Sequence, residues 1–229
     1  LILLSSCSSM HNTQIVESSF TKWGINDYVS FSKKVNKAPL QYLPTFASDE
    51  ASLLSFIHSY DQPLLTDKSL HIDVRMKYAL EYSLMPNILK TKYTEGSSYG
   101  IDYNLELIHI MGIELISYNQ IYTVTDKYKK TFDKNAKNYH SNMAKFELME
   151  PLVTKMFSQG FNTLIDRHIF SNEQRIILAN YLFQSSQKLR KRLDKKSKEL
   201  LVDMAKHTLI NEQNTKIKKL IKKTIKQLK

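Results

Sequence analysis

The pentapeptide GSSYG at 96–100 has the G-x-S-x-G spacing of a serine nucleophile elbow, with Ser98 at its centre. In such an elbow a tight turn between a strand and a helix exposes the serine hydroxyl for acyl transfer. The site also needs an acid, a histidine and an oxyanion loop, and no Gly-rich loop follows a histidine in this sequence. Because Gly and Ser are common in ordinary turns, the pentapeptide is more simply explained as a turn, and a hydrolase site at Ser98 is the alternative.

Glu106 and His109 form a Glu-x-x-His pair, the spacing with which di-iron carboxylate bundles hold metal. Residues three apart on a helix point the same way, so both side chains can enter a bundle core. Such centres use two of these pairs, whereas this sequence contains no second Glu-x-x-His. A lone histidine on an apolar helix is more often a hydrogen-bonded core residue, so we expect no cofactor and no bound metal. A metal site near His109 is the alternative.

The C-terminal segment 211–229 is predicted to be a basic amphipathic helix. Its apolar residues recur at helical spacing, with Thr224 interrupting the stripe, and they are Ile217, Leu220, Ile221, Ile225 and Leu228. The candidate residues for binding an anionic surface are seven lysines with no acidic residue among them: Lys216, Lys218, Lys219, Lys222, Lys223, Lys226 and Lys229. The apolar stripe either enters a membrane interface, with the lysines on anionic headgroups, or packs on the protein's own helices.

The net charge of +11 is concentrated at the C-terminal end of the chain. Residues 184–229 carry 15 Lys or Arg and 4 acidic residues, while residues 1–183 carry 18 of each. The protein is therefore a neutral body with a basic end, a pattern that fits contact with nucleic acid or with an anionic surface. The basic segment 211–229 contains no aromatic residue that could stack on a base.

The elements that must position these residues are predicted to be helices. With 229 residues and 42% hydrophobic residues, the chain can fill one helical-bundle-like core, and five Gly and five Pro are few for a fold rich in tight turns. Capping and stop signals predict a helix over 45–60 that Ser48 caps and a helix that ends at Gly160. A capping box of Ser171 with Gln174 opens one long helical run through 209.

The segment 70–84 has two interpretations, because apolar residues occupy every even position in it. That alternation is typical of a strand. A helix is favoured by a start signal at Thr66-Asp67, by the spacing of Asp73 and Lys77, and by Pro86 as a stop. A buried helix is the main prediction for this segment.

Residues 101–124 pose the same ambiguity, since they are largely apolar with few charges. A small antiparallel β element that pairs 70–84 with 101–107 is the alternative to two helices. The predicted fold class is mainly α, a single helical-bundle-like domain with a C-terminal basic amphipathic helix.

The chain starts with the residues LILLSSC, an apolar run and two small residues before the only cysteine. Leu4-Ser5-Ser6-Cys7 resembles the lipobox of bacterial lipoproteins. The resemblance implies that 1–6 are the remnant of a signal peptide and that Cys7 carries diacylglycerol on its sulfur, with its amino group acylated by a fatty acid such as palmitate. By the sorting rule of this family, Ser8 implies an outer-membrane lipoprotein facing the periplasm, which makes nucleic acid an unexpected partner.

These patterns predict a lipid-anchored tether over 7–45 that is partly docked, a helical domain over 46–210, and the basic tail over 211–229. We expect a non-enzymatic lipoprotein of the bacterial cell envelope. Its partners would be the membrane, through the acylated Cys7, and an anionic lipid or an envelope protein, through the basic tail. The alternative is an envelope hydrolase that uses Ser98 or a metal site near His109.

Overall fold

The computed structural model describes residues 24–48, 63–147 and 149–229, and the regular structure in these ranges is entirely helical. The elements are α2 (Ile25–Lys37), the 3-10 helix η1 (Leu40–Tyr42), α4 (Pro63–Thr66), α5 (Ile72–Ser98), α6 (Asn104–Thr131), α7 (Tyr139–Glu147), α8 (Met149–Ile165), α9 (Asn172–Leu189), α10 (Lys195–Asn211) and α11 (Thr215–Leu228). The prediction of a mainly α fold is confirmed. The β alternative is wrong, because 72–84 lie in α5 and 104–107 lie in α6.

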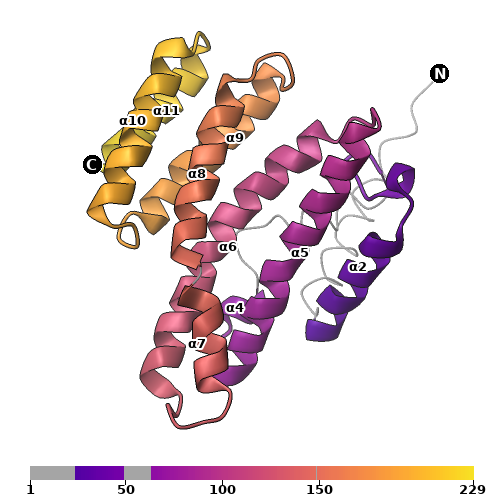
Figure 1. Ribbon diagram of the computed structural model, residues 1–229, viewed down its shortest axis with the longest axis vertical. Coiled ribbons are helices and arrows are strands. Elements are labelled where there is room, and N and C mark those ends of the chain that lie inside the picture. The colour runs from indigo at the N-terminus through magenta and orange to yellow at the C-terminus, as the bar shows by residue number, and fades with distance from the viewer. Residues whose placement is uncertain (1–23, 49–62, 148) are drawn as a thin grey trace, which may run out of the picture.

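The long helices α5 and α6 form the centre of the molecule (Figure 1). On one side α2 and η1 pack on α5. On the other side α6 packs on α8 and α9, while α10 contacts α8 and α11 contacts both α9 and α10. Helices α2 and α11 therefore lie at opposite edges of the molecule (Figure 1).

The buried apolar side chains form two clusters that meet at α6. The N-terminal cluster joins α2, α4, α5 and α7 to α6, and it includes Ile113 and Val124. The C-terminal cluster joins α8, α9, α10 and α11 to α6, and it includes Ile108 and Leu115. Because successive residues of a helix point in different directions, the one helix α6 supplies side chains to both clusters.

Helix α5 explains why the alternating pattern of 70–84 does not indicate a strand. Its most deeply buried residues recur three or four positions apart, as in Met76, Ala79 and Tyr82. Leu80 is also packed against the same cluster, although it is only partly buried, whereas Leu84 is exposed. Helices α2 and α6 both pack on α5, so α5 buries a wide sector of its surface. When the apolar sector of a helix is this wide, apolar residues can fall on every second position, as they would in a strand.

The start of α5 differs from the predicted start at Thr66-Asp67. The Asp67 carboxylate accepts hydrogen bonds from the backbone N–H and the hydroxyl of Ser69, at 2.8 and 2.7 Å, and so forms a turn. The N-cap is His71, whose Nδ1 accepts from the Asp73 N–H at 3.3 Å. The predicted start is therefore wrong by one helical turn.

Pro86 does not end α5, which continues to Ser98. A proline inside a helix removes one backbone hydrogen bond and costs about 3 kcal/mol. Pro86 is buried among the helices that cover α5, so tertiary packing offsets this cost. The predicted i,i+4 pair of Asp73 with Lys77 is confirmed, with 3.5 Å between the carboxylate and Nζ.

The predicted run from 171 to 209 is two helices instead of one. The capping box at its start is confirmed, because Ser171 Oγ accepts from the Gln174 N–H and Gln174 Oε1 accepts from the Ser171 N–H. Helix α9 ends at Leu189, and α10 begins after Asp194, whose carboxylate accepts from the Ser197 N–H at 2.6 Å. Asp194 therefore acts as a second N-cap that splits the run.

Gly160 lies inside α8 and not at its end, so the predicted C-cap is wrong. It is buried against α9, where a Cβ on Gly160 would lie 2.8 Å from Leu182 Cδ2. The glycine is thus explained by the close approach of two helices.

The segment between α2 and residue 48 is fastened to the central helices through its backbone. Tyr93 Oη donates to the Pro44 carbonyl at 2.6 Å, and Tyr103 Oη donates to the Leu40 carbonyl. Of the helix predicted over 45–60, residues 49–60 lie outside the described residues. None of the described helices combines the length and the apolar composition that crossing a membrane requires.

Candidate functional site

Ser98 lies in the last turn of α5 and does not have the strand–turn–helix geometry of a nucleophile elbow. Its hydroxyl donates to the Glu95 carbonyl at 2.6 Å, as a serine at a helix end commonly does. The N–H groups of residues 99–101 donate back to the carbonyls of residues 96–97, and Gly100 has a φ of +83°. The pentapeptide therefore closes a helix, with no strand before it and no sharp turn that presents Ser98.

Glu106 and His109 both make contacts that hold the fold together. Glu106 is buried, and its Oε1 accepts from the Phe46 N–H at 2.9 Å. His109 Nδ1 lies 2.9 Å from Tyr181 Oη, and its ring is 4.5 Å from the Phe46 ring between centroids. The pair thus fixes the segment around Phe46 against α6 and α9. Within the part of the chain that the structure describes, no group of three His, Cys, Asp or Glu could hold a metal ion.

The environment of His109 favours a neutral imidazole. Burial lowers the pKa of His109 below its ordinary value of 6.5, and burial raises the pKa of Tyr181 to about 12. The Tyr181 ring lies so close to α6 that a Cβ on Gly112 would fall 2.2 Å from its Cδ2. A neutral histidine and a neutral phenol at this distance form an ordinary core hydrogen bond.

Helix α11 buries its apolar stripe against the protein's own helices. Asn214 caps its start by accepting from two backbone N–H groups, at 3.0 and 3.2 Å. Ile217, Ile221 and Leu228 are at most 1% exposed and belong to the cluster that α9 and α10 share. Thr224 fills the interruption of the stripe, with its hydroxyl donating to the Leu220 carbonyl at 3.0 Å. Of the two alternatives for the stripe, packing on the protein's own helices is the one that the structure shows.

The seven candidate lysines of α11 form one surface, which we call the α11 lysine face (Lys216, Lys218, Lys219, Lys222, Lys223, Lys226 and Lys229). Six of them are exposed and Lys218 is partly exposed. A shallow depression runs along this surface, and it is lined by Thr215 and by lysines of α11. The ion pairs among the described residues include none of the seven lysines, so their charge is not compensated by a carboxylate of that part of the chain.

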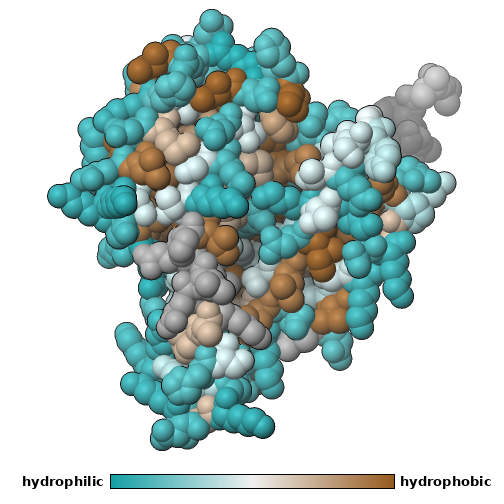
Figure 2. Space-filling model, in the orientation of Figure 1, coloured by the Kyte–Doolittle hydropathy of each residue, from teal (hydrophilic) through white to brown (hydrophobic). Residues whose placement is uncertain are grey.

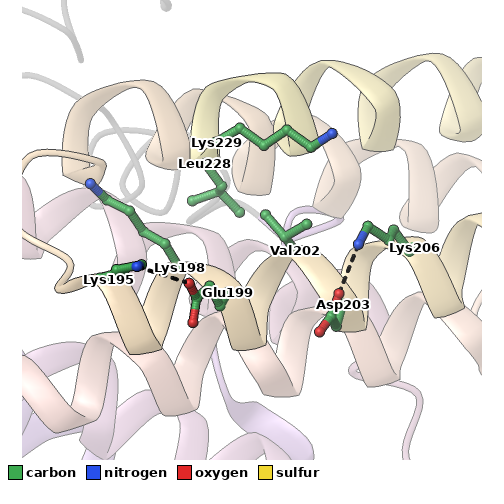
Figure 3. A pocket seen from close by; sticks show the side chains of 8 residues that line it. All are labelled: Lys195, Lys198, Glu199, Val202, Asp203, Lys206, Leu228 and Lys229. Atoms are coloured by element: carbon green, nitrogen blue, oxygen red, sulfur yellow. Dashed lines mark hydrogen bonds and ion pairs between the residues drawn. The ribbon is translucent and has the colours of Figure 1, made fainter.

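The groove between α10 and the end of α11 has a different, mixed character (Figure 3). Lys195 pairs with Glu199 at 3.9 Å and Lys206 pairs with Asp203 at 2.8 Å. The apolar floor of the groove includes Val202, which is 8% exposed. Two of the four lysines that line this groove are therefore paired with carboxylates. The α11 lysine face has no such pairs among the described residues, so it is the more strongly basic of the two surfaces.

The turn between α9 and α10 adds a cation that the tail prediction did not include. Arg190 Nη1 donates to Gln227 Oε1 at 3.3 Å, so this turn meets the C-terminal end of α11. Gln227 lies four residues after Lys223, which places both on one side of α11. The run KLRKRLDKK at 188–196 is visibly basic in the sequence. Only the fold shows that this run lies beside α11.

Cys7, the predicted lipidation residue, lies outside the described residues. Comparisons of the chain with protein-family models, with curated proteins and with solved structures found no match. The candidate site therefore rests on the geometry of α11 and of the elements beside it.

Proposed function

We propose that the protein is a non-enzymatic lipoprotein of the bacterial cell envelope, held by an acylated Cys7, whose helical domain contacts an anionic envelope component. The resemblance of Leu4-Ser5-Ser6-Cys7 to a lipobox supports the anchor. The observation that carries the proposal is the α11 lysine face, a row of lysines without carboxylate partners among the described residues.

The contact that we propose is electrostatic and peripheral. A lysine near an anionic membrane surface contributes about 1 kcal/mol of binding free energy, and the contribution decays within a Debye length. Because the apolar stripe of α11 is already buried, insertion of this helix would first require its detachment from α9 and α10. Binding through the lysines leaves the fold unchanged, so this mode of contact is the favoured one.

An acyl anchor and a basic surface on one molecule reinforce each other. Once the anchor holds the protein at the envelope, the second contact becomes intramolecular and its effective concentration rises. With Ser8 after the cysteine, the proposed location is the periplasmic side of the outer membrane, and no nucleic-acid partner is proposed.

The test is the intact mass of the protein extracted from membranes of its native host. The proposal predicts a species that begins at Cys7 and carries added diacylglycerol and acyl mass. The variant Cys7→Ser should lose both the added mass and the membrane association that resists a salt wash. An unmodified chain that continues upstream of Leu1 would contradict the anchor.

A further inference from the structure

The turn between α9 and α10 joins the α11 lysine face to α6 as well. Arg192 Nη1 lies 2.5 Å from Asp126 Oδ2, and the Arg192 guanidinium lies 5.4 Å from the centroid of the Tyr122 ring. Tyr122, Asp126 and Lys130 are spaced by four residues, so they share one side of α6. Lys130 is therefore on the side of α6 that the turn contacts, one helical turn beyond the ion pair.

The hairpin between α6 and α7 continues this basic surface beyond the end of α6. Residues 127–140 contain five lysines and one acidic residue. All five lysines are exposed, including Lys134 and Lys137 in the connection. Figure 1 shows the hairpin projecting at one end of the molecule, and in Figure 2 this projection is mostly hydrophilic.

An aromatic stack makes the hairpin a rigid platform for these lysines. The Tyr128 ring stacks on Phe132, with centroids 4.4 Å apart, and on Tyr139, with centroids 5.8 Å apart. The turn itself is closed by Asp133, whose Oδ1 accepts from the Asn135 N–H at 2.9 Å. Because these aromatic rings stack on one another, they are not available to stack on nucleic-acid bases.

We infer that the α11 lysine face, the turn 190–192 and the hairpin 127–140 form one continuous basic edge, and that this edge lies against a bilayer that contains anionic phospholipids. The inference rests on the proposed function and names the partner and the extent of its binding surface. Four acidic residues near the edge have partners within the protein. Asp126 pairs with Arg192, Asp133 closes the hairpin turn and Asp194 caps α10. Asp73 pairs with Lys77 and accepts from the Asn138 side chain of the hairpin.

The shape of the edge favours a bilayer over a compact anion. Helix α11 alone presents lysines over 13 residue steps, which corresponds to about 20 Å along its axis. The turn contacts both the C-terminal end of α11 and α6, and the hairpin follows the end of α6, so the basic surface extends beyond α11. A bilayer offers many phosphates at once over such an extent, and it needs no specific pocket for any of them.

The test compares three variants that each lose three positive charges from the full chain, with Cys7→Ser in every protein so that no acyl chain binds vesicles. The hairpin variant is Lys130→Gln/Lys134→Gln/Lys137→Gln. The α11 variant is Lys219→Gln/Lys223→Gln/Lys226→Gln. The matched control variant is Lys33→Gln/Lys34→Gln/Lys37→Gln, in which all three exposed lysines lie on α2 at the opposite edge (Figure 1).

Binding is measured by flotation with vesicles of phosphatidylethanolamine and phosphatidylglycerol, and with phosphatidylcholine vesicles as the neutral reference. Three lysines in contact with the bilayer, at about 1 kcal/mol each, predict a loss of about 100-fold in the partition coefficient. We expect that loss for the hairpin and α11 variants, a change below about 3-fold for the control, and no binding to phosphatidylcholine. Circular dichroism of each variant confirms that the helices are retained.

The contrary outcomes separate the inference from the proposed function. If the hairpin variant binds anionic vesicles as well as the control does, while the α11 variant binds them more weakly, the continuous edge is overturned and the proposed function is left intact. Equal binding by all three variants overturns both the continuous edge and the α11 lysine face as the membrane-binding surface, while the acyl anchor is tested separately by the intact mass. Tighter binding to duplex DNA than to the anionic vesicles, measured in the same buffer, overturns the assignment of a bilayer as the partner.

Discussion

The two halves of the molecule use a similar arginine to fasten a long helix to the segment before it. Arg75 is in the first turn of α5, and its Nε and Nη2 donate to the Leu65 carbonyl at 3.0 and 2.5 Å. Arg175 occupies the same position in α9, and its Nε donates to the Leu164 carbonyl at 2.8 Å. Both side chains are buried, at 5% and 2% exposure. Each arginine satisfies a carbonyl that the preceding helix leaves without an intrahelical partner.

The difference lies in how many elements the arginine joins. Arg175 also pairs with Glu212, which is 3% exposed, and the other Glu212 oxygen accepts from the N–H groups of Gln213 and Asn214 at 2.8 and 2.7 Å. Arg175 therefore links α8 and α9 to the start of α11, whereas the hydrogen bonds of Arg75 to Leu65 link α4 to α5. The position of the basic helix thus depends on a buried ion pair.

Breaking that pair should give the largest effect on stability. The substitution Arg175→Met leaves the buried Glu212 carboxylate without its partner, so we expect a loss of about 3–5 kcal/mol in the free energy of unfolding. Urea denaturation followed by circular dichroism measures this loss. The double variant Arg175→Met/Glu212→Leu should recover part of it, because no buried charge then remains. A loss below about 1 kcal/mol for the single variant would contradict the importance of the pair.

The matching change in the N-terminal half should cost less. Arg75→Met removes hydrogen bonds from a charged group to the Leu65 carbonyl, for which we expect a loss of about 1.5–3 kcal/mol. The same urea measurement applies, with Lys77→Met as a control two residues away whose side chain is exposed. If Arg75→Met destabilises the protein as much as Arg175→Met does, the two arginines are equivalent and the contrast between the halves is lost.

The ion pair of Lys90 with Glu114, at 3.1 Å, provides a smaller effect that depends on pH. Burial raises the pKa of Glu114 above its ordinary value of 4.5, and Lys90 offsets only part of that rise. Between the unfolded and the folded pKa the native state binds more protons, so stability decreases as the pH rises through this window. We therefore expect Glu114→Gln to be more stable than the parent at pH 7. We also expect the stability of this variant not to decrease as the pH rises through the window.

The measurement is the free energy of unfolding of both proteins from about pH 4 to about pH 7. Parallel curves for the parent and for Glu114→Gln would show that the carboxyl does not carry the pH dependence. A variant that is less stable than the parent at pH 7 would show that the attraction of Lys90 outweighs the cost of burial.

The smallest effect on stability is expected for the lysines of α11. These three side chains are exposed, and Lys223 Nζ lies 5.3 Å from the centroid of the Phe183 ring. Because exposed substitutions cost little, Lys219→Gln/Lys223→Gln/Lys226→Gln should change the free energy of unfolding by less than about 0.5 kcal/mol. Urea denaturation of this variant shows whether the binding surface is separate from the contacts that hold α11 in place. A large destabilisation would mean that the lysines support the fold, and that their loss weakens vesicle binding indirectly.

Much of the fold was predictable where local signals agree with the tertiary structure. The capping box at Ser171 and the helical period of α11 act within a few residues, so the sequence alone reveals them. The signals that failed were those that tertiary contacts override. Pro86 is tolerated inside a covered helix, and Gly160 serves the packing of α8 on α9 instead of a helix end.

The candidate site was predictable only as a list of lysines. Their spacing places them opposite the apolar stripe, but it does not say whether that stripe is free or buried. The contacts of Arg190 with Gln227 and of Arg192 with Asp126 join residues 37 and 66 positions apart, and no local pattern encodes them. The motifs around Ser98 and His109 likewise do not reveal the partners of these residues, which are the Glu95 carbonyl and the Tyr181 hydroxyl.

The placement of α6 in both hydrophobic clusters has a consequence for cooperativity. If α6 detaches, buried apolar surface is exposed in both halves at once, so neither half can unfold alone while the other keeps its core. We therefore expect one unfolding transition for the described domain, with the amide hydrogens in the middle of α6 exchanging only through global unfolding. In this sense α6 makes the two clusters a single folding unit.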